Sequence, residues 1–115
     1  MKPIRVKDVM TDDELEEFEE LNYAVLTSAT KMKRNFYNKD IENLIEKAKD
    51  RYFRKKWKRR INVSYEHDED GYFIATCSDF DGCYSQGKTL LEATENIREA
   101  IELCLEELVE NEREI

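Results

Sequence analysis

Three stretches of this 115-residue chain place residue types at spacings that could do chemistry. GCYSQGKT at residues 82–89 has the spacing of a phosphate-binding loop, in which glycines open the backbone and a lysine meets the phosphate. RYFRKKWKRR at residues 51–60 combines cations with aromatic rings, as nucleic-acid-binding segments do. A third set consists of carboxylates that could converge on metal ions in a nuclease: Glu66, Asp68, Asp70, Asp79 and Asp81.

The surroundings of residues 82–89 argue against nucleotide binding. A phosphate-binding loop of this type follows a buried apolar strand in a large doubly wound sheet. Residues 83–86 are themselves strand-like, and the 26 residues after Thr89 contain no further strand pattern. We therefore expect Gly82 and Gly87 to allow tight turns at the ends of a short strand.

The carboxylates have the composition of ordinary turns. HDEDG at residues 67–71 and SDFDG at residues 78–82 place aspartates next to glycine, which favours tight turns over catalysis. His67 is the only histidine, and no nucleophile stands at a telling spacing from it. We predict no catalytic residue, no metal, no cofactor and no enzymatic activity.

Cysteine usage and hydropathy indicate the compartment. Cys77, Cys83 and Cys104 have no CxxC spacing and lack a fourth zinc ligand, so we expect free thiols in a cytoplasmic protein. The chain contains no apolar run of about 18 residues, and no apolar segment follows its charged N-terminus. Neither a membrane span nor a secretory signal is predicted.

Charge is distributed very unevenly along the chain. The net charge is −8, but residues 1–30 carry −5, residues 31–60 carry +9 and residues 61–115 carry −12. A chain divided in this way is expected to present two functional surfaces, or one surface that neutralises another. Solvation of exposed faces is the simpler explanation, above all for the first block.

Periodicity over the first 60 residues predicts two helices. TDDE at residues 11–14 is a capping box, and apolar residues then recur at helical spacing as far as Met32 and Phe36. We expect that helix to end near residues 35–38, and a second to begin at residue 38 or 40. Residues 2–9 alternate loosely and predict a short strand or an ordered arm.

From residue 60 onward the pattern becomes that of a small sheet. Residues 60–78 alternate on either side of a DEDG turn and predict a β-hairpin, and residues 83–86 predict a third strand. Thr89 and Glu92 form a second capping box before a long apolar stripe. The predicted fold class is α+β: a three-stranded antiparallel sheet covered by one long helix and preceded by two helices.

Residues 61–108 resemble the HicB antitoxin family. The resemblance rests on SDFDGC at residues 78–83, SQGKT at 85–89 and LEATENIREAI at 91–101. It implies a partial ribonuclease-H-like fold without the nuclease active site, and a partner, the small ribonuclease toxin HicA, which the antitoxin holds inactive. The corresponding domain boundaries are a helical extension at 1–59 and a HicB-like domain at 60–115.

The chain departs from the family pattern in three places. Ser78 and Asp81 stand where the family loop has prolines, which predicts a less rigid loop. The family usually continues into another strand and a DNA-binding segment, so regulation of an operon by that segment is in doubt. Residues 1–58 have no counterpart that the resemblance explains.

Two hypotheses of function follow. In the first, an antitoxin-like homo-oligomer neutralises a HicA-like toxin through the loop residues Asp79, Phe80 and Asp81, with Glu66 and Asp68. In the second, a small transcriptional regulator binds nucleic acid through the cations of the basic stretch: Arg54, Lys55, Lys56, Lys58, Arg59 and Arg60. For that stretch we favour a helix whose aromatic rings face the core while its cations meet acidic groups.

Overall fold

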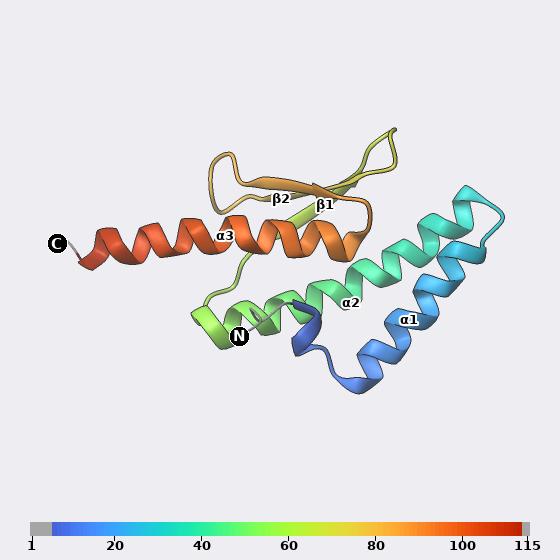
Figure 1. Cartoon of the computed structure of the whole chain (residues 1–115), viewed down its shortest axis with the longest axis horizontal. Coiled ribbons are helices and arrows are strands. Elements are labelled where there is room, and N and C mark those ends of the chain that lie inside the picture. Colours follow the sequence, from blue (N-terminus) through green and yellow to red (C-terminus); the bar gives the residue numbers. More distant parts are fainter. Residues whose placement is uncertain (1–5, 114–115) are drawn as a thin grey trace. The chain divides into compact units, whose positions relative to one another are not determined.

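The computed structural model describes residues 6–113 of the chain, and their side chains as far as residue 109. The chain divides into two compact units, residues 1–60 and 61–115. The first unit is helical, and the second contains a sheet and one long helix (Figure 1). The predicted α+β class, with two helices before a three-stranded antiparallel sheet and a final helix, is confirmed.

The first unit is a helical hairpin preceded by a short 3-10 helix. This turn, η1 (Val6–Val9), replaces the predicted strand or arm, whose residues 2–5 lie outside the described residues. Helix α1 (Asp12–Thr27) begins with the predicted capping box, in which Glu14 N donates to Thr11 Oγ1 at 3.2 Å and Thr11 N donates to Glu14 Oε1 at 2.9 Å. Two of the four unsatisfied amides at the helix start are thereby paired.

The boundary between the two helices differs from the prediction. Helix α1 ends at Thr27 and α2 (Lys31–Trp57) begins after only three intervening residues, so the predicted end near residues 35–38 is wrong. The hydroxyl of Thr30 accepts a hydrogen bond from Lys33 N at 3.2 Å and thus caps the new helix. Side chains of this type compete with the helical backbone, and they set the break although apolar periodicity runs straight through it.

An ion pair joins the start of α1 to the C-terminal part of α2. The Arg51 guanidinium donates to both carboxylate oxygens of Glu14, at 2.7 and 3.2 Å, and to the Val9 carbonyl at 2.8 Å. This hydrogen bond to Arg51 is the main cause that lowers the pKa of Glu14 to about 2. One guanidinium therefore holds η1, α1 and α2 together.

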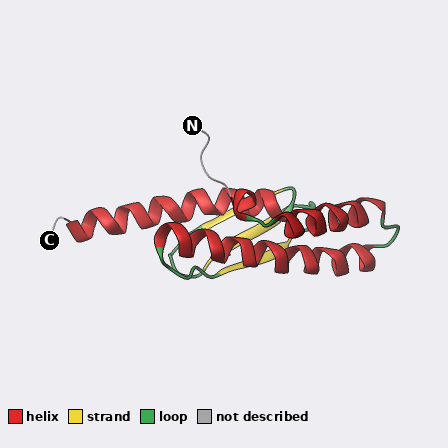
Figure 2. Cartoon of the chain, turned by 90° about the horizontal axis from the view of Figure 1, so that it is seen from below, coloured by secondary structure: helices red, strands yellow, loops and turns green. Residues whose placement is uncertain are grey.

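The second unit is a meander of three antiparallel strands with a helix on one face. Strand β2 (Phe73–Cys77) lies between β1 (Val63–His67) and β3 (Tyr84–Gly87). Residue partners in the ladder include Tyr65 with Ala75 and Ala75 with Ser85. Helix α3 (Leu90–Arg113) follows β3 directly and packs on β2 and β3 (Figures 1 and 2).

Close approach of α3 to β3 depends on Gly87. A Cβ atom built on this glycine would lie 2.4 Å from the backbone nitrogen of Ala93 and 2.8 Å from the carbonyl carbon of Glu92. Thr89 begins the helix by accepting a hydrogen bond from Glu92 N at 3.0 Å, as predicted for the first half of the second capping box. Gly87 is therefore a packing residue, fully buried under the first turn of the helix.

Candidate partner-binding surface

The loop between β2 and β3 is short and fastened to the sheet. Asp79 Oδ2 accepts a hydrogen bond from the backbone nitrogen of Asn62 at 2.8 Å, just before β1 begins. Cys77 N donates to the Cys83 carbonyl at 2.9 Å, which extends the ladder up to the loop. Gly82 adopts a positive φ of 69°, the left-handed conformation that glycine accepts without steric cost. The Asp79 side chain thus has a structural task in the loop.

Phe80 and Asp81 form the outward part of this loop. Asp81 is exposed, whereas Phe80 is half-buried. An aromatic ring that is partly covered beside an exposed carboxylate matches an apolar anchor with a polar rim. These two residues remain available to a partner, because none of the loop hydrogen bonds described above uses their side chains.

Asp68 shapes the turn between β1 and β2. Its Oδ1 atom accepts hydrogen bonds from the backbone nitrogens of Asp70 and Tyr72, each at 2.9 Å. Gly71 has a φ of 89° in the same turn. This is an aspartate turn in which the side chain replaces a backbone acceptor, so the geometry explains Asp68 without a ligand.

The predicted contact residues do not form one cluster. Asp79, Phe80 and Asp81 follow the last residue of β2, while Asp68 precedes its first residue. Five residues of extended strand separate these two ends by about 13 Å. Glu66 is exposed in β1 opposite Ile74, near the hairpin turn. A partner that touched all five residues would have to span the length of the sheet.

The face of the sheet opposite α3 is a further exposed surface, which the sequence analysis did not identify as a site. Its two rows across the strands follow from the register: Ser64, Thr76 and Tyr84 in one, Glu66, Ile74 and Gln86 in the other. Only Ile74 among them is partly covered, and Tyr84 is 69% exposed. The alternation over residues 60–78 indicated part of this face, but no sequence pattern pointed to Tyr84.

Two thiols lie on the side of the sheet that α3 covers, and a third belongs to α3 itself. Cys77 and Cys83 are buried, and Cys104 of α3 is partly covered. Desolvation, followed by the neighbouring Cys77 and Cys104, raises the pKa of the Cys83 thiol to about 11. Protonated thiols are poor nucleophiles. Among residues 6–109, no group of three or more histidine, cysteine or acidic side chains is arranged to hold a metal ion.

The GCYSQGKT motif at residues 82–89 is accounted for by the same sheet. Residues Tyr84–Gly87, which make up half of the GCYSQGKT motif, form β3 and pair with Phe73–Thr76 of β2. Backbone that pairs in a ladder does not form the crowded nest of amides that surrounds a phosphate. The positive φ of Gly82 and the close contact of Gly87 with α3 thus explain both glycines of the motif.

In the basic stretch, cations and aromatic rings are separated by burial. Tyr52 and Phe53 are 2% and 0% exposed, so their rings cannot stack on bases. Lys56 Nζ donates to the Tyr52 hydroxyl at 3.3 Å. The six predicted nucleic-acid contacts are all exposed: Arg54, Lys55, Lys56, Lys58, Arg59 and Arg60. Lys58 ends α2 in a left-handed conformation with a φ of 54°.

A shallow depression on α2 continues this basic surface. Lys47, Asp50, Arg51, Arg54 and Lys55 line it. Four cations against one carboxylate make it attractive to anions. The basic stretch at residues 51–60 indicated Arg51, Arg54 and Lys55. It did not reveal the depression, because Lys47 and Asp50, which also line it, lie outside that stretch.

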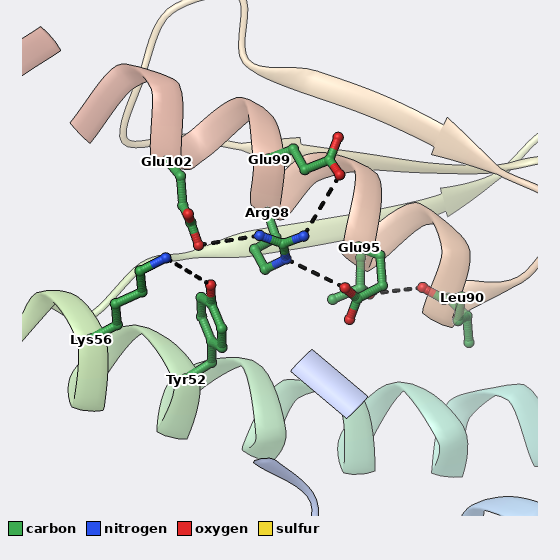
Figure 3. A network of polar contacts seen from close by, with 8 residues as sticks. Tyr52, Lys56, Leu90, Glu95, Arg98, Glu99 and Glu102 are labelled. Atoms are coloured by element: carbon green, nitrogen blue, oxygen red, sulfur yellow. Dashed lines mark hydrogen bonds and ion pairs between the residues drawn. The ribbon is translucent and has the colours of Figure 1, made fainter. Parts of the chain in front are cut away.

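A second group that the sequence analysis missed lies on α3. Figure 3 shows the Arg98 guanidinium among three carboxylates of its own helix, with Glu95 and Glu102 at 3.3 Å and Glu99 at 3.7 Å. The Arg98 side chain is only 6% exposed, whereas that of Glu99 is 72% exposed. The helical spacings of three and four residues could have revealed the group. Its place within the buried part of α3 makes it structural.

The second unit of the chain is similar to known proteins. A family model described as the HicB-like antitoxin of a bacterial toxin–antitoxin system matches residues 60–115. Among curated proteins, a UPF0150 protein of Synechocystis is 51% identical over 51 residues, which are 44% of this chain and 74% of the relative. The chain belongs to the HicB-like antitoxin family. No solved structure matches it significantly.

Further relatives extend the same similarity. A UPF0150 protein of Helicobacter pylori is 52% identical over 52 residues, 45% of this chain and 71% of the relative. One from Thermoplasma acidophilum is 44% identical over 56 residues, 49% of this chain and 81% of the relative. The HicB-like family model covers the sheet, the β2–β3 loop and α3, and it does not extend to α1 or α2.

Hydropathy of the helices adds one observation. Within residues 6–113, no helix is long and apolar enough to cross a bilayer.

Proposed function

We propose that the HicB-like unit binds and neutralises a small ribonuclease toxin of the HicA type. The observation that carries this proposal is the match of residues 60–115 to a family described as antitoxins. The family implies a toxin partner in general terms, and the resemblance of the loop and helix motifs to HicB suggests HicA in particular. An inhibitor needs no active site of its own, and we propose accordingly that the protein is not an enzyme.

Charge supports docking on a basic, RNA-binding surface. Residues 61–115 carry 15 acidic and 3 basic side chains, a net charge of −12. Exposed carboxylates on α3 include Glu99, Glu106 and Glu107. These groups would occupy the places of RNA phosphates, and their field would speed the encounter with a basic partner. Bulk charge therefore supports association, while specific contacts must determine how slowly the complex dissociates.

Within that surface we propose Phe80 and Asp81 as direct contacts. Asp79, placed with them in the sequence analysis, is more important for holding the loop, because its carboxylate accepts the Asn62 amide. Asp68 holds the hairpin turn by the same type of bond. Glu66 and Tyr84 belong to the exposed sheet face and would contact a partner only if it covers that face.

Capture of a co-expressed HicA-type toxin tests the proposal. We expect the full chain to restore growth and to co-purify with the toxin, and Phe80→Ala with Asp81→Ala to weaken binding about 100-fold, as loss of a hot spot does. Asp70→Ala, an exposed acid at the other end of the sheet, is the matched control with the same change in charge as Asp81→Ala. Absence of toxin binding by the wild-type chain would refute the function. Unchanged binding by the double variant would refute only the site.

Nucleic-acid binding is kept as a second candidate because six cations are exposed at the end of α2. With Tyr52 and Phe53 buried, any such binding would rely on phosphate contacts and would depend steeply on salt. Fluorescence anisotropy with an unrelated DNA duplex at two salt concentrations tests this. Binding that is unaffected by Arg59→Ala with Arg60→Ala would contradict it.

Four finer features belong to the same proposal. We propose that residues 1–59 and 60–115 act as separate modules, that the sheet and α3 represent a partial ribonuclease-H-like fold, and that the protein works in the cytoplasm as a homo-oligomer. Support comes from the HicB resemblance, from the three free thiols and from the open sheet face. A sedimentation measurement of the purified chain tests the homo-oligomer.

A further inference from the structure

The closed end of the α1–α2 hairpin exposes four large apolar side chains. Tyr23 and Leu26 lie in the last two turns of α1, and Met32 and Phe36 in the first two turns of α2. They are 70%, 84%, 82% and 67% exposed. We call these four residues the hairpin tip. Scattered exposed apolar residues are common, but four within 14 residues at one turn indicate a contact surface.

Cations surround the hairpin tip where they disfavour the helix. Lys31, Lys33 and Arg34 occupy the first turn of α2, which contains no acidic residue. Positive charge at a helix N-terminus opposes the helix dipole. Arg34 is explained by its hydrogen bond to the Ser28 carbonyl at 3.4 Å. Lys31 and Lys33 have no ion-pair partner among the side chains of residues 6–109, so the described part of the fold does not account for them.

The two helices of the hairpin carry opposite charge. Helix α1 has seven acidic and no basic residues, while α2 has ten basic and four acidic ones. On α1, the exposed acids Glu16, Glu19 and Glu20 lie within two turns of the hairpin tip. Any partner that covers the tip therefore meets a negative surface on one helix and a positive surface on the other.

We propose that the hairpin tip is the interface of a symmetric dimer, in which α1 of each copy faces α2 of the other. A two-fold axis brings the same patch of both copies together, so the apolar side chains pack on each other. The same axis sets the acids of one α1 against Lys31 and Lys33 of the partner α2. Nucleic acid or an anionic bilayer would be repelled by α1, and a basic toxin by the lysines.

This inference deepens the homo-oligomer proposed above and is independent of toxin capture. Sedimentation velocity of the full chain without any partner is expected to give twice the monomer mass of 13.8 kDa at about 50 µM. Leu26→Ser with Phe36→Ser should raise the dimer dissociation constant at least about 100-fold. Leu103→Ser is the matched control, because Leu103 of α3 is also 63% exposed but lies outside the hairpin tip.

A pair of charge reversals separates the proposed arrangement from other dimers. Lys31→Glu with Lys33→Glu, and in a second chain Glu19→Lys with Glu20→Lys, should each give monomers, because like charges then face each other. An equimolar mixture of the two variants should restore the dimer. Circular dichroism confirms that each variant is folded.

Several outcomes would overturn the inference. They are a monomeric wild-type chain, a dimer that the apolar substitutions leave intact, and a mixture of charge variants that stays monomeric although both are folded. A monomer that still captures toxin would refute the hairpin-tip dimer and leave the proposed function standing.

Discussion

Substitution of Gly87 by alanine tests the contact that joins α3 to the sheet. The new Cβ would lie 2.4 Å from the Ala93 nitrogen, whereas ordinary contacts of Cβ atoms begin near 3.4 Å. Backbone of α3 must therefore retreat by about 1 Å, because no side-chain rotation can relieve a clash with backbone atoms. Overpacking of this kind costs about 2–3 kcal/mol. That is about a 30- to 150-fold increase in the opening of the second unit.

Hydrogen exchange followed by mass spectrometry measures this effect in each unit separately. We expect faster exchange throughout residues 61–109 of Gly87→Ala and little change in α1, since the clash lies wholly within the second unit. Hydrogen exchange also avoids describing the unfolding of a two-unit chain by a single two-state transition.

Substitution by asparagine at Gly71 and at Gly87 provides the control. Gly71 has a φ of 89° and open space around its Cβ position, so Gly71→Asn introduces backbone strain but no clash. It should cost less than Gly87→Asn, because asparagine tolerates the left-handed region better than most side chains. Gly87→Asn should be at least as harmful as Gly87→Ala, because its problem is steric. Equal exchange in Gly87→Ala and the wild type would refute the close approach of α3 and reopen the phosphate-loop interpretation.

Three more perturbations follow from the polar contacts. The pKa of Glu14 is about 2, below its ordinary value of 4.5, so the ion pair with Arg51 stabilises the fold above pH 4.5 and is lost as pH falls toward 2. Arg51→Gln should cost about 1 kcal/mol after solvent screening and flatten that acid limb in thermal unfolding; identical pH profiles would contradict this. Arg98→Met removes the ion pair between Arg98 and the Glu102 carboxylate, which is 12% exposed, and should cost about 2 kcal/mol in urea unfolding; an unchanged midpoint would contradict this. Cys83, with a pKa of about 11, should resist iodoacetamide at pH 8 until urea is added, so rapid labelling of the native protein would show that the thiol is accessible.

Local sequence chemistry predicted much of the fold correctly. The capping box at Thr11, the helix cap at Thr89 and the turn at Gly71 depend on residues within four positions of one another, and each lies where expected. Alternation likewise predicted which residues of β1 face α3, such as Tyr65, whose hydroxyl lies 2.6 Å from Thr94 Oγ1. Such features form because their partners are neighbours in the chain or follow its period.

Errors arose where two signals competed. Apolar periodicity continued from α1 into Met32 and Phe36 and predicted one longer helix. The chain instead starts a new helix, α2, capped by Thr30, and both side chains lie in solvent. Apolar periodicity indicates which side of one continuous helix each residue would occupy. When the backbone breaks between two helices, periodicity counted across the break no longer predicts which side chains are buried.

The candidate site shows the same division between sequence and structure. The sequence alone showed the acidic character of the second unit, the loop motif at residues 78–83 and the similarity to antitoxins. Charge and motif depend only on residue type and order. Only the tertiary structure separated Asp68 from Asp79 by the length of β2 and showed both carboxylates bonded to backbone amides. It also brought Gly87 under the first turn of α3. Distances between strand ends and between a strand and its covering helix depend on register and packing, which no single stretch of residues encodes.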